Sequence, residues 1–577
     1  MDPTPTLAEP MIKTSEPYVA QPAARIVRAV EAAILLVAAV FFALHFVHFK
    51  ADFPNRSPWP DWSKFTDEGW YSHAAIRHFQ LGRWYLPGDF NPAAAVPMWP
   101  VVEAAVFRFT GVSVVAARAL AVALFGLSLV CCYRLMQRWS RAAGRVSLAP
   151  AVAVLLIAVN PLYYAFSRLA VLEPLLILLT LAALLAASAA GGASAEAAGS
   201  DESSRSRQYL RSAAWAVALG MLLPLMVLTK TTGTFLIPAI FWMLWTASGH
   251  QVRPFVRAAV VAGGTGAALW GGYFGLFVRP TYLADYRYLF AVNTNTGIAQ
   301  EPFWPVLESV LLGLQWIGGI LLVLALIAIA GCLVRMGARS RRANFNANPL
   351  FGTLLVWILG YGAFLVYHAN PSPRYYVVLV IPISMLAAMF FEPLVVGAFR
   401  GRSQVQAGGP PTARLDDMLR RLPAFAAGVA LLFVVFSGAR QTLGFVRHPE
   451  YTYLDAAEQI RQAVALERAA DPDHSELVLS ISGAQLSLMT GLESICDDFG
   501  TMELRERVAT YKPGWFAAWN YVEDDKMDAL APTYRLVRVG AFPALDDPNR
   551  NLLILYRLDP IGAPGVGEQP SPVQLKH

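Results

Sequence analysis

The chain has 577 residues, of which 56% are hydrophobic and 15% are charged, with a formal net charge of +6. Soluble domains carry about 25% charged residues, so this composition excludes an ordinary soluble protein and indicates a chain that crosses a membrane many times. The four cysteines form no CxxC motif, which argues against a disulfide framework, a cysteine metal site or redox chemistry.

A membrane-spanning helix needs about 20 mainly apolar residues. The first such run, Ala29 to Phe49, follows a polar N-terminal tail and lacks the small-residue cleavage site of a signal peptide, so we interpret it as a retained span. The sequence predicts about eleven spans: 28–49, 113–135, 147–165, 169–189, 212–229, 232–248, 256–278, 307–333, 350–368, 375–398 and 423–439.

Every second loop between these spans is rich in arginine. Basic residues accumulate in cytoplasmic loops, so the +6 charge indicates orientation in a bilayer and not a nucleic-acid partner. The tail 1–27 is predicted to be cytoplasmic, whereas the first outer loop (50–112) and everything after about residue 440 face the outside of the inner (plasma) membrane. The arginines that set this orientation are Arg25, Arg28, Arg134, Arg138, Arg141, Arg145, Arg205, Arg207, Arg211, Arg253, Arg257, Arg335, Arg339, Arg341, Arg342, Arg400, Arg402, Arg414, Arg420 and Arg421.

The segment 441–560 differs from the rest of the chain. "YLDAAEQIRQAVALE" has helical apolar spacing, and "ELVLSIS", "YRLVRVG" and "NLLILYRL" are typical of short strands. The predicted fold is therefore mainly α: a membrane domain (28–440), a small extracytoplasmic α/β domain (441–560) and a flexible tail (561–577).

Several polar side chains fall at the outer ends of the predicted spans. Charges at such places are costly, so they are functional candidates, although a single basic residue often only reaches the lipid headgroups. Three cations at one membrane level favour a site for a phosphate group. The candidates are Arg168 and Glu173 in "FSRLAVLEPLL", Lys230 in "LTKTTGTFLIP", and His368, Arg374 and Tyr375 in "YHANPSPRYYVV".

The first outer loop contains the adjacent acids Asp67 and Glu68 in "FTDEGWYSHAA". Their local sequence favours a helix start, with Thr66 or Asp67 as the N-cap and Glu68 in the first turn. His73 is a further candidate, but its spacing from these acids matches no standard metal site. The sequence identifies no certain cofactor, and a divalent cation that binds through donor oxygens stays an open option.

In their order, these features resemble the GT-C class of polytopic glycosyltransferases that use lipid-linked sugars. They are a first outer loop with "DE", then "SRLAVLEPLL", "TKTTGTFLIP" and "SPRYYVVLVIP", and an extracytoplasmic tail. Residues 50–440 are most similar to the bacterial branch related to protein O-mannosyltransferases (family 39) and the lipid A aminoarabinose transferase (family 83).

This resemblance implies a cavity that opens to the outer leaflet and a polyprenyl-phosphate sugar as donor. One base opposite one leaving group then implies direct displacement with inversion at the anomeric carbon. Asp67 matches the aspartate that acts as base, and Glu68 matches its neighbour. Arg168, Lys230, Arg374 and Tyr375 match positions that bind the donor phosphate. The resemblance does not identify the acceptor, which is a protein, lipid A or another envelope glycan.

Two other classes of function stay open. A transporter or flippase of lipid-linked saccharides also needs many spans and a cationic outer cavity, but favours charged or broken helices at the bilayer midplane and repeat symmetry. A non-catalytic assembly protein would recruit partners through the C-terminal domain.

Overall fold

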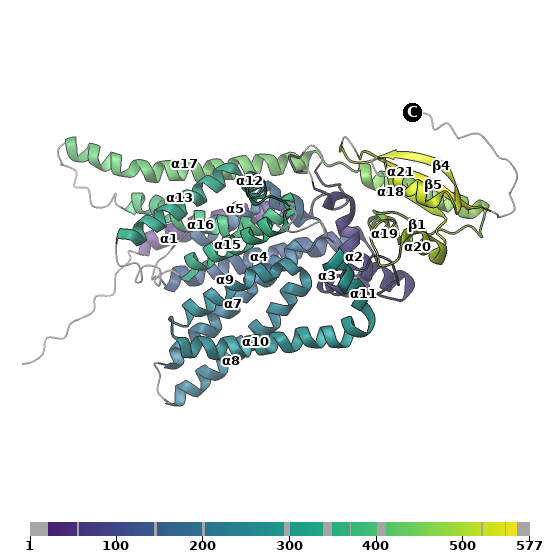
Figure 1. Cartoon of the computed structure of the whole chain (residues 1–577). Coiled ribbons are helices and arrows are strands. Elements are labelled where there is room, and N and C mark those ends of the chain that lie inside the picture. The colour runs from purple at the N-terminus through teal and green to yellow at the C-terminus, as the bar shows by residue number, and fades with distance from the viewer. Residues whose placement is uncertain are drawn as a thin grey trace, which may run out of the picture.

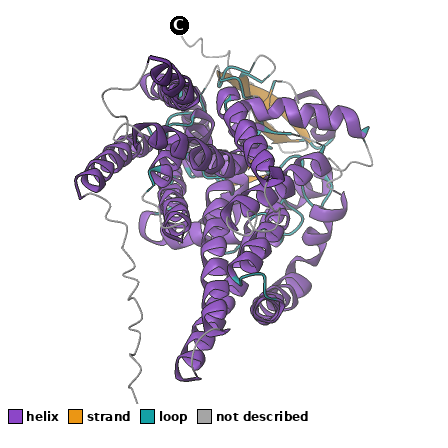
Figure 2. Cartoon of the chain, turned by 90° about the vertical axis from the view of Figure 1, so that its left-hand side faces the viewer, coloured by secondary structure: helices purple, strands orange, loops and turns teal. Residues whose placement is uncertain are grey.

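The computed structural model describes residues 21–54, 57–59, 61–142, 147–198, 202–292, 301–338, 349–369, 371–400, 411–520, 523–547 and 550–561. Most of the predicted N-terminal tail and nearly all of the predicted flexible tail lie outside these ranges. A body of long helices occupies one part of the molecule, and a small sheet lies beyond one end of it (Figure 1). In the view turned by 90°, several helices are seen nearly end-on, so they run roughly parallel (Figure 2).

By length and composition, eight helices of the described chain qualify as membrane spans, or up to ten if each of two bent helix pairs counts as one span. A shorter apolar helix covers Thr231–Ala247. Each of the eleven predicted segments falls on one of these, so the prediction of a multi-pass helical membrane protein is confirmed. The helices are α1 (Gln21–Ala43), α4 (Val114–Ala142), α5 (Ala149–Ala158), α6 (Pro161–Ser167), α7 (Glu173–Ala198), α8 (Glu202–Thr229), α9 (Ile237–Ala247), α10 (Val252–Tyr273), α12 (Phe303–Gly313), α13 (Gly319–Ala338), α15 (Pro349–His368), α16 (Pro373–Arg400) and α17 (Pro411–Arg447).

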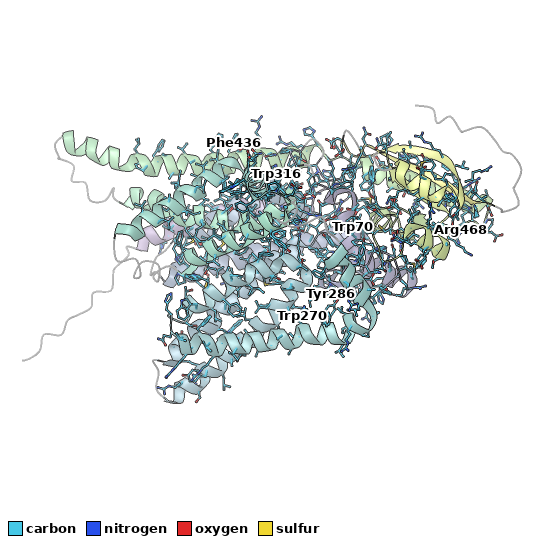
Figure 3. The ribbon with its side chains drawn as sticks, viewed as in Figure 1. Trp70, Trp270, Tyr286, Trp316, Phe436 and Arg468 are labelled. Atoms are coloured by element: carbon cyan, nitrogen blue, oxygen red, sulfur yellow. The ribbon has the colours of Figure 1, made fainter. Side chains whose placement is uncertain are left out.

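The outer surface of the helical body is apolar. Leu36 on α1 is 67% exposed, and Phe436 on the outer face of α17 is also 67% exposed (Figure 3). Large apolar side chains facing outward along whole helices are unfavourable in water but match a lipid environment. The exposed faces therefore support the same conclusion as the hydropathy of the sequence.

Two of the spans are broken, and the breaks contact each other. Helices α5 and α6 meet at 65°, and the segment Phe303–Ile317, which consists of α12 and the 3₁₀ turn η6 (Leu314–Ile317), meets α13 at 108°. Asn160 caps α6, since its side chain accepts a hydrogen bond from the Tyr163 backbone N–H at 3.0 Å. Its amide nitrogen also donates to the Ile317 carbonyl at 2.8 Å. One side chain thus satisfies backbone groups that both breaks expose, which a helix inside a membrane requires.

The segment 50–112, predicted to be the first outer loop, contains two α-helices, α2 (Ser63–Leu81) and α3 (Met98–Thr110), which lie between the helical body and the sheet (Figure 1). The short α11 (Leu283–Arg287) lies near the same junction. Asn91 of the first loop donates to Asp285 of α11 at 2.9 Å. A hydrogen bond thus joins the segment 50–112 to α11 at one end of the spans.

The C-terminal segment is a small mixed α/β unit, as predicted. Its sheet has the order β2-β1-β3-β5-β4, in which β2, β1 and β3 are parallel and β5 is antiparallel to both β3 and β4. The predicted helix and three predicted strands are present, whereas β2 and β3 were not foreseen. The elements are α18 (Thr452–Ala470), β1 (Val478–Leu479), α19 (Gly483–Thr490), β2 (Ser494–Ile495), α20 (Leu504–Tyr511), β3 (Trp515–Trp519), α21 (Glu523–Leu530), β4 (Tyr534–Pro543) and β5 (Leu552–Pro560).

Candidate active site

The predicted N-cap at Thr66 or Asp67 is wrong, because α2 begins earlier, at Ser63. The carboxylate of Asp61 accepts a hydrogen bond from the Ser63 backbone N–H at 2.9 Å and so satisfies a donor at the helix start. Asp67 consequently lies in the second turn of α2. Both Asp67 and Glu68 are almost fully buried, with 2% and 3% of their surface exposed.

Asp67 faces the start of α16, where it forms an ion pair with the guanidinium of Arg374. The backbone N–H of Arg374 donates to the second acid of this region, Asp61, at 3.1 Å. The guanidinium also donates to the Tyr375 hydroxyl at 3.1 Å. Arg374 therefore lies between two carboxylates and a phenol, and only 13% of its side chain is exposed.

Tyr375 connects this pair to a second buried pair. Lys230, in the turn after α8, forms an ion pair with Glu173 at the start of α7, and its ammonium lies 4.6 Å from the centroid of the Tyr375 ring. His368, at the end of α15, contacts the Tyr375 hydroxyl at 3.2 Å. We call Asp61, Asp67, Glu173, Lys230, His368, Arg374 and Tyr375 the acid–cation cluster.

The charges of the acid–cation cluster nearly cancel. Two cations, Lys230 and Arg374, face three carboxylates. In a buried region each unpaired charge is costly, so this pairing explains how two cations and three carboxylates share one location.

Glu68 points away from Asp67 and belongs to a different set of contacts. Its two carboxylate oxygens accept two hydrogen bonds from the Arg118 guanidinium, each at 2.7 Å. The backbone N–H of Ala170 donates to it at 2.9 Å, and the Gln485 amide donates at 3.2 Å. Burial alone raises the pKa of Glu68, but the charge and hydrogen bonds of Arg118 outweigh burial and the pKa is lowered. Glu68 is thus a fully satisfied carboxylate that joins α2, α4, the α6–α7 turn and α19.

Arg168 and His73 do not join the acid–cation cluster. The Arg168 guanidinium donates to the Tyr164 hydroxyl and the Val47 carbonyl, both at 2.7 Å. His73 is buried on the side of α2 that faces the C-terminal domain, and burial together with the charge of Arg77 holds its pKa well below its usual value. Neither residue contacts Asp67, so their predicted part in the site gains no support from these contacts.

The C-terminal domain contacts the backbone on both sides of Asp67. The Tyr453 hydroxyl donates to the Phe65 carbonyl at 2.9 Å, and the Gln485 side chain accepts from the Gly69 N–H at 2.8 Å. In a regular α-helix the N–H of residue 69 pairs with the carbonyl of residue 65, so these two side chains hold the turn that carries Asp67. A Cβ on Gly69 would come within 2.1 Å of the Gln485 backbone nitrogen, and only glycine permits this approach.

Four residues with these contacts were not predicted from the sequence: Asp61, Arg118, Tyr453 and Gln485. Arg118 was detectable, because it stands in the apolar run "VVAARALAVALFG" at the start of a predicted span, where a charge is a functional or structural candidate. No local pattern distinguishes Asp61, Tyr453 or Gln485 from ordinary surface residues.

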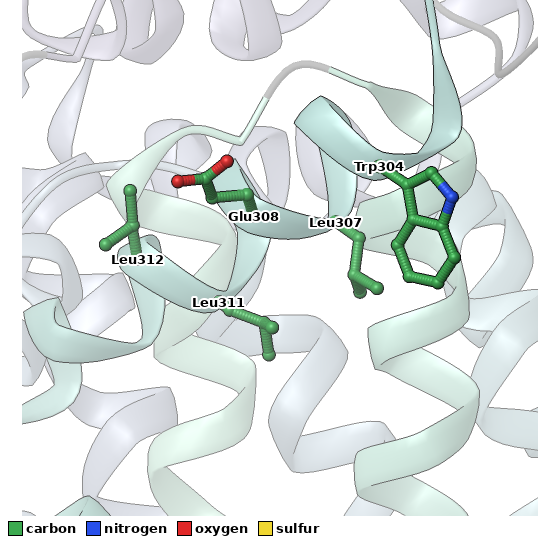
Figure 4. Close-up of a pocket in the computed structure, with 5 residues that line it drawn as sticks. All are labelled: Trp304, Leu307, Glu308, Leu311 and Leu312. Carbon is green, nitrogen blue, oxygen red and sulfur yellow. The ribbon is translucent and has the colours of Figure 1, made fainter.

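A broad depression of about 450 Å³ lies elsewhere, on the outside of α12 (Figure 4). Its wall is formed by Trp304, Leu307, Glu308, Leu311 and Leu312. Trp304 is 74% exposed, and Glu308 is the only charged residue of the wall. The depression offers no cation for a phosphate, so we assign the candidate active site to the acid–cation cluster.

Two crystal structures of ArnT from Cupriavidus metallidurans are similar to this chain over nearly its whole length. The ArnT structure bound to undecaprenyl phosphate has a TM-score of 0.52 at 14% identity, and the match covers 93% of this chain and 98% of ArnT. The apo structure has a TM-score of 0.54 at 15% identity, with 91% and 98% covered. This is the GT-C fold.

The GT-C fold includes the C-terminal part of the chain as well as the spans, since the match extends over more than nine-tenths of both proteins. The predicted polytopic GT-C architecture with a C-terminal α/β domain is therefore confirmed. Comparison of the sequence with models of protein families and with curated proteins finds no match.

Proposed function

We propose that this protein is an integral-membrane glycosyltransferase that moves a sugar from a polyprenyl-phosphate donor to an acceptor hydroxyl on the extracytoplasmic face. The observation that supports the proposal most is the buried Asp67–Arg374 pair, at the junction of spans and outer loop in a GT-C fold. It sets a carboxylate, a candidate base, beside a guanidinium that can bind phosphate. The arginine-rich alternate loops support an orientation in which the site lies on the extracytoplasmic side of the membrane.

In the proposed reaction, the donor phosphate binds Arg374 and takes the place of a carboxylate there. Arg374 suits this role, since a guanidinium has five donors and binds phosphate through two of them. Lys230 adds a second positive charge beside Tyr375. Cations that are already in position stabilise the leaving phosphate without large reorganisation.

Asp67 acts as the general base in this proposal. It takes the proton of the acceptor hydroxyl as the acceptor oxygen forms a bond to the anomeric carbon, while the bond from that carbon to the phosphate oxygen breaks. The phosphate leaves as an anion and needs no general acid. One displacement inverts the anomeric carbon. Glu68 is a positioning residue, because its oxygens are occupied by Arg118, Ala170 and Gln485.

The proposal predicts a sugar that is absent from the cell envelope when the gene is deleted. We expect mass spectrometry of envelope glycans and glycoproteins to show the loss of one glycosyl residue, restored by the wild-type gene but not by Asp67→Asn. Loss of this sugar together with retention of the lipid-linked sugar on the cytoplasmic leaflet would instead indicate a transporter.

The two cations of the cluster predict a donor-binding phenotype. We expect Arg374→Ala and Lys230→Ala to weaken binding of undecaprenyl phosphate to the purified protein by about tenfold or more, because each removes a charge that pairs with the phosphate. A suitable control is Arg468→Ala, which removes an exposed cation on α18 at the far end of the C-terminal domain (Figure 3). Unaltered affinity in both cluster variants would contradict the phosphate assignment.

A further inference from the structure

The carboxyl ends of the parallel strands β2, β1 and β3 meet α2. The residue Ile481, after β1, accepts a hydrogen bond from the indole N–H of Trp70 at 2.9 Å. At the end of β3, the Trp519 ring lies 4.9 Å from the Phe65 ring, between centroids. In open α/β sheets, ligands bind outside the carboxyl ends of parallel strands. Here that edge lies against the helix that carries Asp67.

Three aromatic rings form a corner at this edge. Trp70 of α2 lies 5.1 Å from Phe90 of the first loop and 5.2 Å from Phe499 of the loop after β2, between ring centroids. Phe90 and Phe499 are 5.4 Å apart. Phe90 is buried, but Trp70 and Phe499 are both partly exposed. The hydrogen bond to Ile481 fixes the Trp70 ring, so its free surface has a defined orientation. Figure 3 shows Trp70 at the junction of the helical body and the C-terminal domain.

The loop after β2 also supplies two adjacent acids. Asp498 is partly exposed and forms an ion pair with Lys526 at 2.8 Å. Asp497 is only 2% exposed, and its Oδ1 makes no hydrogen bond with any residue that the structure describes. Burial raises the pKa of Asp497 to about 7, although the charge of Lys526 opposes the shift. A buried carboxyl oxygen without a partner is costly, and a ligand hydroxyl would satisfy it.

This chemistry suits a sugar ring. One face of a pyranose is a flat array of C–H groups that packs on an aromatic plane, and its hydroxyls pair with carboxyl oxygens. Trp70 is three residues after Asp67, so the two are neighbours on the surface of α2. A saccharide on Trp70 therefore lies within about one helical turn of the proposed base.

We propose that Trp70, Phe499, Asp497 and Asp498 form an acceptor subsite for a saccharide. This rests on the proposed function and deepens it, because it assigns the acceptor to the carbohydrate class and gives the C-terminal domain a part in binding it. Trp70 and Phe499 hold the face of the sugar, and the two aspartates bind its hydroxyls. The acceptor hydroxyl then points toward Asp67.

The test uses full-length protein and soluble oligosaccharides released by mild acid from the envelope of a deletion strain, which carry the unmodified acceptor. We expect saturation-transfer NMR and calorimetry to show binding to wild type, and Trp70→Ala and Asp497→Asn each to weaken it at least tenfold. Trp70→Phe, which keeps an aromatic ring, should retain most of the affinity. Trp270→Ala, at an exposed tryptophan of α10, is the matched control and should bind as wild type does.

Undecaprenyl phosphate binding and sugar transfer are measured on the same samples. If the variants transfer sugar normally and bind the oligosaccharide as tightly as wild type, the subsite is overturned while the proposed function stands. Modification of a synthetic Ser/Thr-rich peptide in place of the oligosaccharide would overturn it as well. If the wild-type protein transfers no sugar from the polyprenyl-phosphate donor to any acceptor, the proposed function itself is contradicted.

Discussion

Asp67→Asn is expected to reduce sugar transfer by about 10²–10⁴-fold, which is the usual contribution of a general base. The variant keeps the shape of the side chain but removes the charge that accepts the proton. Binding of the polyprenyl-phosphate donor should survive and is expected to become somewhat tighter, since Asp67 no longer competes with the phosphate for Arg374. Transfer rates and donor affinity, both measured on purified protein, separate these two effects.

A matched control is Asp528→Asn, because Asp528 is an exposed acid on α21. It should leave both quantities unchanged. Thermal unfolding shows whether Asp67→Asn retains the fold. A folded Asp67→Asn protein with wild-type transfer would remove the basis for the base assignment. Lost donor binding with an intact fold would instead indicate that Asp67 positions Arg374.

The second large effect is expected on stability. Arg118→Ala should reduce the free energy of unfolding by about 3–5 kcal/mol, because it leaves the buried Glu68 carboxylate without its main partner. Glu68→Leu should destabilise for the reciprocal reason, since among the described residues it leaves the Arg118 guanidinium with the Phe49 and Ala51 carbonyls as hydrogen-bond acceptors, each at 2.6 Å. The double variant Glu68→Leu/Arg118→Leu should be less destabilised than the two single effects added together. Thermal unfolding in detergent at matched concentrations measures all of them.

An exposed ion pair on α18 serves as the comparison. Arg461 and Glu458 are each 43% exposed, so Arg461→Ala should change stability far less than Arg118→Ala does. If Arg118→Ala is equally mild, the Glu68 contacts do not hold α2 against α4 and α19. The role of Glu68 as a positioning residue would then have no support.

The similarity to ArnT extends over the C-terminal domain, so this domain is part of the fold. Its contacts with α2 indicate that it holds this helix in position. Tyr453 and Gln485 hold the two backbone groups that bracket Asp67, and the close approach at Gly69 leaves no space for a side chain. We therefore regard α2 as a shared element, placed by the spans on one side and by the C-terminal domain on the other.

The spans were predictable because a helix in lipid needs a long apolar run, and such runs are read directly from "AILLVAAVFF" or "LLVLALIAIA". The position of the polar candidate residues relative to the membrane surface was predictable for the same reason. Glu173, Lys230, His368 and Arg374 stand at the ends of apolar runs, so they had to lie near one surface. The structure brings them together with Asp67 and Tyr375, and their catalytic and binding roles stay predictions.

Which residues pair with the charged candidates was visible only in the tertiary structure. Adjacent positions on a helix point in different directions, so Asp67 faces α16 while Glu68 faces α4. Local sequence treats the two acids as equivalent and even favours a helix start there. The true start, at Ser63, depends on Asp61, whose other oxygen contacts Arg374.

By itself, then, the sequence determined the membrane class, the spans and the position of the charged residues relative to the membrane surface, because hydropathy is a local property. Only the tertiary structure decided which acid meets which cation, because that choice is made by helices far apart in the chain.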